Sequence, residues 1–290
     1  MSEGTAPSLG RSAGMPSPRR GEAALRADET YALGLARAAA GALIFSFPLL
    51  MTMEMWALGA HMDRLRLAAF LVVSAGVVLG LSHFAGFRDT RTLGDDALDA
   101  LAALLIGALV AAVLLVLMGL LTIHTAAREA VGMIAVQAAP AAIGAVLANK
   151  QLKARDQERS KEDRAGYLGQ LFLMASGALF FAFNVAPTDE MILISFRMTP
   201  WHALALIAVS LLTLHALVFS VGFAGQEQHE SQRLAFLHYS LAGYGVALLV
   251  SVYILWTFGR LDGGLSDTAR AIVVLGFPAA IGAAAARLVV

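Results

Sequence analysis

The sequence predicts an all-α, polytopic membrane protein with about eight transmembrane helices, arranged as two four-helix repeats of the same orientation. Hydrophobic residues make up 58% of the 290 residues and charged residues only 14%, with a mean hydropathy of +0.71. A soluble domain of this length needs more charge on its surface. Apolar runs such as residues 101–121 also have the length of about 20 residues that a helix needs to cross a bilayer.

Eight apolar segments mark the expected spans, with ends placed to within a few residues. They cover residues of about 33–56, 66–86, 99–121, 130–149, 167–187, 200–223, 234–257 and 270–289. Most linkers between them are short. The exception is the strongly charged segment 150–166, which is expected to be a cytoplasmic linker, either a solvated helix or a coil.

The chain is therefore expected to have four parts. Residues 1–30 are rich in Ser, Gly, Pro and Arg without apolar periodicity, which predicts a disordered cytoplasmic tail. A cleaved signal peptide is the rival interpretation, but the first apolar stretch starts late and runs too long for one. Residues 31–149 and 167–290 are the two repeats, and 150–166 joins them.

Lys and Arg are distributed unevenly between the two sides that this topology creates. Most of them lie in the N-terminal tail, in the loops after the second, fourth and sixth spans, and at the C-terminal end. Basic residues concentrate on the cytoplasmic side of membrane proteins. Both termini are therefore expected in the cytoplasm, and Glu54 near the outer end of the first span.

An internal duplication is predicted by a shift of 136 residues, which places 31–47 over 167–183. The matched residues go beyond Leu and Ala and include Tyr31 and Tyr167, Gly41 and Gly177, Thr52 and Thr188, Glu54 and Glu190, and Met55 and Met191. After a two-residue slip, PAAIGA at 140–145 recurs at 278–283. A unit with an even number of crossings returns the chain to its starting side, so the repeats should be parallel, about an axis along the membrane normal.

The repeated Thr-x-Glu-Met pattern supplies the candidate site. A carboxylate at membrane depth is costly and often marks an ion pathway. Two of them near one axis would attract cations or share a proton. The candidate ion-pathway residues are Glu54, Glu190, Thr52, Thr188 and Asp189. The alternative is that Glu54 lies among hydrated headgroups and interacts with Arg64 or Arg66.

Two further sets of residues are expected to shape the helices. Pro48, with Asn184 and Pro187 in the second copy, predicts kinks, and broken membrane helices commonly line cavities. Small residues at four-residue spacing let helices approach closely, which predicts a packing seam between the repeats or between protomers. This second set is Pro140, Ala141, Gly144, Ala145, Pro278, Ala279, Gly282 and Ala283.

Several functions are disfavoured. Cysteine is absent, which excludes disulfides and thiolate metal sites, and a net charge of zero suggests no nucleic-acid partner. The seven histidines form no zinc motif, and nucleotide-binding and nucleophile signatures are missing. No cofactor or metal is expected. An enzyme is not expected either, although an intramembrane enzyme acting on lipid or quinone stays open.

The duplicated Gly-Ala-Leu, Phe and Thr-x-Glu-Met block, together with the basic central loop, resembles an uncharacterised family of bacterial multi-pass integral membrane proteins. The similarity spans about residues 31–290. It implies a bacterial inner-membrane location and supplies no activity.

The paired carboxylates favour an ion channel or ion-coupled transporter for cations or protons. The alternative is a non-transporting scaffold or sensor that acts through the basic tail and the 150–166 linker. The lipid bilayer and a cation or proton are the expected partners, and a homo-oligomer is left open.

Overall fold

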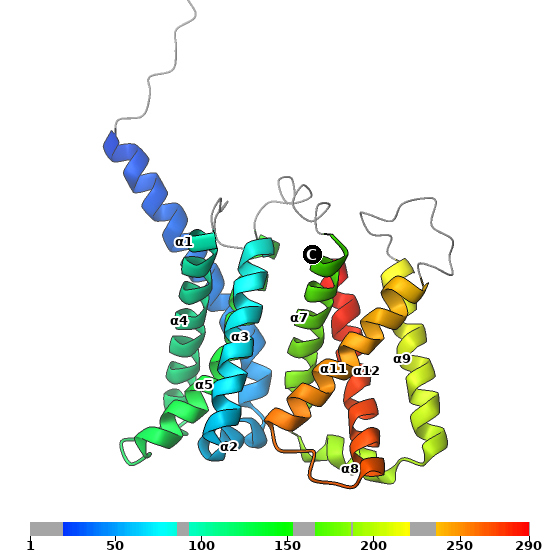
Figure 1. The fold of residues 1–290 in the computed structure, drawn as a ribbon. Helices are drawn as coiled ribbons and strands as arrows, with labels where there is room; N and C mark the ends of the chain where they lie inside the picture. Colours follow the sequence, from blue (N-terminus) through cyan, green and yellow to red (C-terminus); the bar gives the residue numbers. More distant parts are fainter. Residues whose placement is uncertain (1–19, 86–92, 153–165, 187, 221–235, 290) are drawn as a thin grey trace, which may run out of the picture.

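A computed structural model describes residues 20–85, 93–152, 166–186, 188–220 and 236–289 (Figure 1). All regular elements of these described residues are helical. They are α1 (Arg20–Leu50), α2 (Met53–His61), α3 (Arg64–Ala85), α4 (Leu93–Leu117), α5 (Ala127–Leu152), α7 (Tyr167–Val185), α8 (Asp189–Arg197), α9 (Pro200–Ser220), the π-helix η1 (Phe236–Leu241), α11 (Ala242–Thr257) and α12 (Leu265–Val289).

Eight helical segments of the described residues are long and apolar enough to cross a membrane. They are Ala32–Leu50, Arg64–His83, Leu93–Leu117, Ala127–Leu147, Tyr167–Val185, Pro200–Val218, Tyr239–Thr257 and Leu265–Ala286. The predicted all-α, multi-pass fold is confirmed, and the candidate spans fall where the eight apolar segments were expected.

The first and fifth spans end earlier than the hydropathy predicts. The expected span at 33–56 is divided, because α1 ends at Leu50 and Met53 begins the short helix α2. The expected span at 167–187 likewise ends at Val185, and α8 begins at Asp189. The apolar run continues across the first break, so hydropathy alone cannot locate it, whereas Thr188, Asp189 and Glu190 end the apolar run at the second break.

Other helices begin earlier than expected. The helix α1 covers residues 20–30, which were predicted as part of a disordered tail, because Ala, Glu, Leu and Arg in this stretch are strong helix formers. The helices α4 and α12 begin with acidic first turns, which favour a helix N-terminus and lower the local hydropathy. The rest of the tail, residues 1–19, and most of the linker, residues 153–165, lie outside the described residues.

The helices form two groups that lie side by side, α1 to α5 and α7 to α12 (Figure 1). In the first group α5 contacts α1, α2, α3 and α4, and in the second α12 contacts α7, α8, α9 and α11. Both groups thus place a short helix after their first crossing and pack around their last one. The short helices α2 and α8 lie at one end of the bundle, called here the α2–α8 end, and α12 ends at the other (Figure 1).

The small-residue segments pack within each group. A Cβ added at Gly144 would lie 2.8 Å from the Gly41 carbonyl oxygen of α1, and one added at Gly282 would overlap the Gly177 carbonyl oxygen of α7. The predicted seam between repeats or protomers is therefore wrong in its location: α5 packs on α1, and α12 on α7. The alanines of these segments are fully buried; they are Ala141, Ala145, Ala279 and Ala283. The helices α5 and α12 continue through Pro140 and Pro278.

Aromatic rings fill the junction between the two groups. Phe70 of α3 lies 5.2 Å from Phe183 of α7 and 6.2 Å from Phe258, which follows α11, measured between ring centroids. Tyr253 of α11 donates a hydrogen bond of 3.5 Å to the Ala69 carbonyl oxygen. These contacts hold the groups together near the α2–α8 end. The three phenylalanines are called the aromatic cluster below.

Candidate functional site

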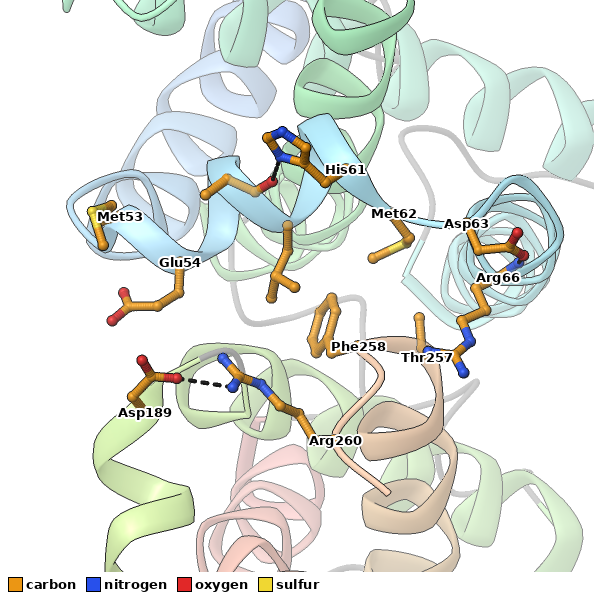
Figure 2. Close-up of a pocket in the computed structure, with 12 residues that line it drawn as sticks. Met53, Glu54, His61, Met62, Asp63, Arg66, Asp189, Thr257, Phe258 and Arg260 are labelled. Carbon is orange, nitrogen blue, oxygen red and sulfur yellow. Dashed lines mark hydrogen bonds and ion pairs between the residues drawn. The ribbon is translucent and has the colours of Figure 1, made fainter. Parts of the chain in front are cut away.

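A groove of about 460 Å³ lies at the α2–α8 end, where the two helix groups meet (Figure 2). We call it the end groove. It is bordered by α2, the start of α3, the first residue of α8 and the turn after α11. Its lining residues are Met53, Glu54, Ala57, Leu58, His61, Met62, Asp63, Arg66, Asp189, Thr257, Phe258 and Arg260.

The two breaks that position α2 and α8 are built in the same way. The Thr52 hydroxyl donates a hydrogen bond of 2.7 Å to the Leu49 carbonyl oxygen, and the Thr188 hydroxyl donates one of 2.9 Å to Val185. Each threonine thereby adds a second donor to a carbonyl at the end of the preceding helix, which also accepts a hydrogen bond from the backbone amide of the same threonine. The two threonines, expected on an ion pathway, thus have a visible structural role, and neither lines the end groove.

Replacing Thr188 by alanine is expected to lower the free energy of unfolding by about 1 kcal/mol, because the Val185 carbonyl loses the hydroxyl donor and keeps only the backbone amide of residue 188. Thr188→Ser keeps the hydroxyl and should retain most of that stability. Thermal unfolding of the purified protein in detergent compares the two variants. Equal losses in both would mean that the methyl group, and not the hydrogen bond, matters at this turn.

The turn after α11 brings a guanidinium group into the end groove. Gly259 has a φ of 68°, a conformation that glycine adopts without strain, and it reverses the chain after α11. Arg260 then reaches Asp189 at the start of α8, with 2.8 Å between Nη1 and Oδ1. The Asp189 side chain is 74% exposed and that of Arg260 only 23%.

The remaining charges of the end groove differ in their partners. Asp63 accepts hydrogen bonds from the backbone amides of Leu65 and Arg66, at 2.9 and 3.3 Å, and so caps α3. The Arg66 guanidinium lies 6.0 Å from the centre of the Trp256 ring. Glu54 makes no hydrogen bond or ion pair with the described residues, and its half-exposed side chain points toward Asp189 and Arg260 (Figure 2).

The end groove does not bring Glu54 and Glu190 together, although the sequence predicted that they would pair. Glu190 is exposed and does not line the groove, whereas its neighbour Asp189 does. Consecutive residues of a helix point about 100° apart, and at the start of α8 it is Asp189 that faces the groove.

The residues expected to kink the helices lie close to the breaks. Pro48 is exposed near the end of α1, and the Asn184 side chain donates a hydrogen bond of 2.8 Å to the Phe180 carbonyl oxygen of α7. Pro187 lies outside the described residues. The described residues of this set therefore stand beside the ends of α1 and α7 rather than in the middle of a span.

Two buried carboxylates in α4 were not identified from the sequence. Asp96 is 2% exposed and Asp99 is 5% exposed, and His83 Nδ1 lies 2.8 Å from an Asp96 carboxylate oxygen. They lie on the same buried face of α4 as Ala103 and Gly107. This helical spacing is the sequence signal from which their burial could have been predicted. They lie toward the opposite end of the bundle from the end groove. Within the described residues, no group of three or more His, Asp or Glu could hold a metal ion.

Comparison with known proteins yields one match. Residues 34–290 match the model of a family described as "Putative integral membrane protein (DUF2391)". No curated protein and no solved structure matches the chain.

Proposed function

We propose that this chain, which belongs to the DUF2391 family of integral membrane proteins, is an ion channel or ion-coupled transporter that passes cations or protons. The observation that carries the proposal is the position of Glu54 in the end groove, between the two helix groups and opposite the Asp189–Arg260 ion pair (Figure 2). We assign the chain no catalytic reaction.

The charges of the end groove support cation binding. Three carboxylates and two guanidinium groups line it, and Arg260 compensates Asp189 while backbone amides hold Asp63. Glu54 keeps an uncompensated negative charge at a membrane boundary, where such a charge raises the local concentration of cations. In this proposal Glu54 receives the ion, and the Asp189–Arg260 pair sets the charge on the opposite wall.

The aromatic cluster supports a closed state. Phe258 lines the end groove, and it packs on Phe70 and Phe183, which are fully buried. An apolar constriction excludes water and hence ions. Ion passage would therefore require the two helix groups to separate at these rings, which favours a gated channel or a carrier over a permanently open pore.

The proposal includes an orientation and an origin. We place both termini in the cytoplasm of a bacterial inner membrane, with the α2–α8 end outside, following the Lys and Arg distribution. We also propose that the two groups arose by duplication. The paired threonine turns, and the glycine contacts of Gly41 with Gly144 and of Gly177 with Gly282, support this origin.

The test is cation flux in proteoliposomes, screened with K⁺, Na⁺, Ca²⁺, Mn²⁺ and H⁺. Glu54→Gln is expected to lower the flux about tenfold, because electrostatic attraction of the ion is lost. Glu190→Gln is the matched control, since Glu190 holds the equivalent position in the second group but does not line the end groove. Equal flux in wild type and Glu54→Gln would reject the role of Glu54.

The closed aromatic cluster also favours the alternative, a non-transporting scaffold or sensor that acts through residues 1–30 and 150–166. In that case wild-type vesicles show no flux with any of the ions. Deleting the tail and neutralising the linker would then abolish the cellular phenotype, while Glu54→Gln would leave it intact.

A further inference from the structure

We propose a second site, distinct from the end groove, that binds the phosphate group of an anionic lipid headgroup. It is a cavity of about 380 Å³ between the end of α2, the start of α3 and the start of α5, called here the α2–α5 cavity. Its lining residues are Gly59, Ala60, Met62, Arg64, Leu67, Ala127, Arg128, Val131 and Gly132. Two arginines and no carboxylate belong to this lining.

Neither arginine makes an ion pair or hydrogen bond with the described residues. Asp63, the neighbour of Arg64, faces the α3 amides and lines the end groove instead. Glu129 follows Arg128 but does not line the cavity. Two guanidinium groups that border one cavity, without an internal anion, form a site for an external one, and phosphate accepts the paired hydrogen bonds that guanidinium donates.

The second helix group fills the corresponding position with its own side chain. Aligning the two PAAIGA segments places Gly132 over Arg270 and Glu129 over Asp267. Arg270 Nη1 donates a hydrogen bond of 3.0 Å to the Met198 carbonyl oxygen, and its other terminal nitrogen pairs with Asp267. In the second group this position is therefore filled by a guanidinium paired with its own carboxylate. In the first group a glycine stands there and leaves the position open.

The glycine that leaves the cavity open also fixes its floor. A Cβ added at Gly132 would overlap the Gly59 carbonyl oxygen, so the backbones of α2 and α5 touch directly there. Both residues are buried in this contact. The cavity therefore has a rigid backbone floor, and its charged groups stand at the rim.

The position of the cavity indicates a lipid as the source of the phosphate. The candidate spans of α3 and α5 begin at Arg64 and Ala127, so the two arginines lie where two spans leave the hydrocarbon. Leu67 and Val131 lie in the first turns of those spans and give the same cavity an apolar side. A basic rim at headgroup level next to an apolar wall suits an anionic phospholipid.

The test is lipid retention, measured by native mass spectrometry of the full-length protein in detergent with added phosphatidylglycerol or phosphatidylcholine. We expect wild type to retain phosphatidylglycerol, and Arg64→Gln/Arg128→Gln to retain about tenfold less. Arg197→Gln is the control, because Arg197 is an exposed arginine at the same end of the bundle and outside the cavity. Arg64→Lys/Arg128→Lys should recover part of the retention, since a point charge replaces a planar one.

A parallel arm adds inorganic phosphate and follows thermal unfolding of the same variants. Stabilisation of wild type by phosphate, lost in the double Gln variant and without selective lipid retention, would support the phosphate site with a soluble ligand. Equal lipid retention and equal phosphate response in wild type, the double Gln variant and Arg197→Gln would overturn the proposal. Neither readout involves ion flux, so this result stands apart from the test of Glu54.

Discussion

Substituting Gly177 by alanine is expected to destabilise the second helix group by about 3 kcal/mol, the upper end of the usual range for overpacked cores. The added Cβ would overlap the Gly282 carbonyl oxygen and approach the Ala286 Cβ to 2.6 Å. The obstacle is backbone, so α7 and α12 must move apart. Close van der Waals packing is the main force that joins helices in a membrane, and every contact along this pair would weaken.

Gly245 of α11 is the matched control, because a Cβ added there meets nothing within 4 Å. Gly245→Ala should be neutral or stabilise by up to about 1 kcal/mol, the difference in helix propensity. Thermal unfolding in detergent, followed by size-exclusion chromatography, separates the two outcomes. Similar midpoints for Gly177→Ala and Gly245→Ala would contradict the close α7–α12 contact.

The helices that span the membrane could be predicted because one physical requirement determines them. A segment such as 101–121 has to bury about 20 apolar residues, and that requirement is visible in any window of sequence. The small residues were recognised for the same reason, since Gly144 and Gly282 lie in repeated segments. Their partners were not predicted, because the sequence does not say which helix a small face contacts.

Of the two breaks, the one after Leu50 was missed because it does not interrupt the apolar run, whereas the one after Val185 lies two residues before the expected end of the fifth span. Each depends on a hydrogen bond from a threonine hydroxyl to a carbonyl three residues earlier. The repeated Thr-x-Glu-Met pattern carried that signal, yet it also fitted an ion pathway. A local capping role and a functional role predict the same residue type at the same depth, and only the geometry separates them.

The candidate site was predicted in part. Glu54 lies in the end groove, and its neighbour across the groove is Asp189 rather than Glu190. The counter-ion Arg260 could not be predicted, because it comes from the turn after α11, a segment distant from α8 in the sequence. Which of two adjacent acids faces inward depends on the phase of α8, and that phase is set by the burial of Met191 and Ser195.

Truncating Phe258 to alanine is expected to raise cation leak through the protein at least about tenfold, because an apolar constriction controls ions by excluding water. Phe258 is 4% exposed, lines the end groove and closes the aromatic cluster with Phe70 and Phe183, at centroid distances of 6.2 and 6.4 Å. It lies after the end of α11, so its removal interrupts no helix. The cost in stability should be about 3–5 kcal/mol.

The control is Phe180→Ala, which removes a ring that packs on Phe45 at 4.9 Å, outside the aromatic cluster. Fluorescent flux assays on vesicles with equal amounts of folded protein compare the two variants. Leak in Phe258→Ala alone would identify the cluster as the barrier of a transport pathway. Leak in both would mean general loosening of the junction between the helix groups. A folded Phe258→Ala protein without leak would contradict the barrier and favour the scaffold, since the same ring would then serve only to hold the two groups together.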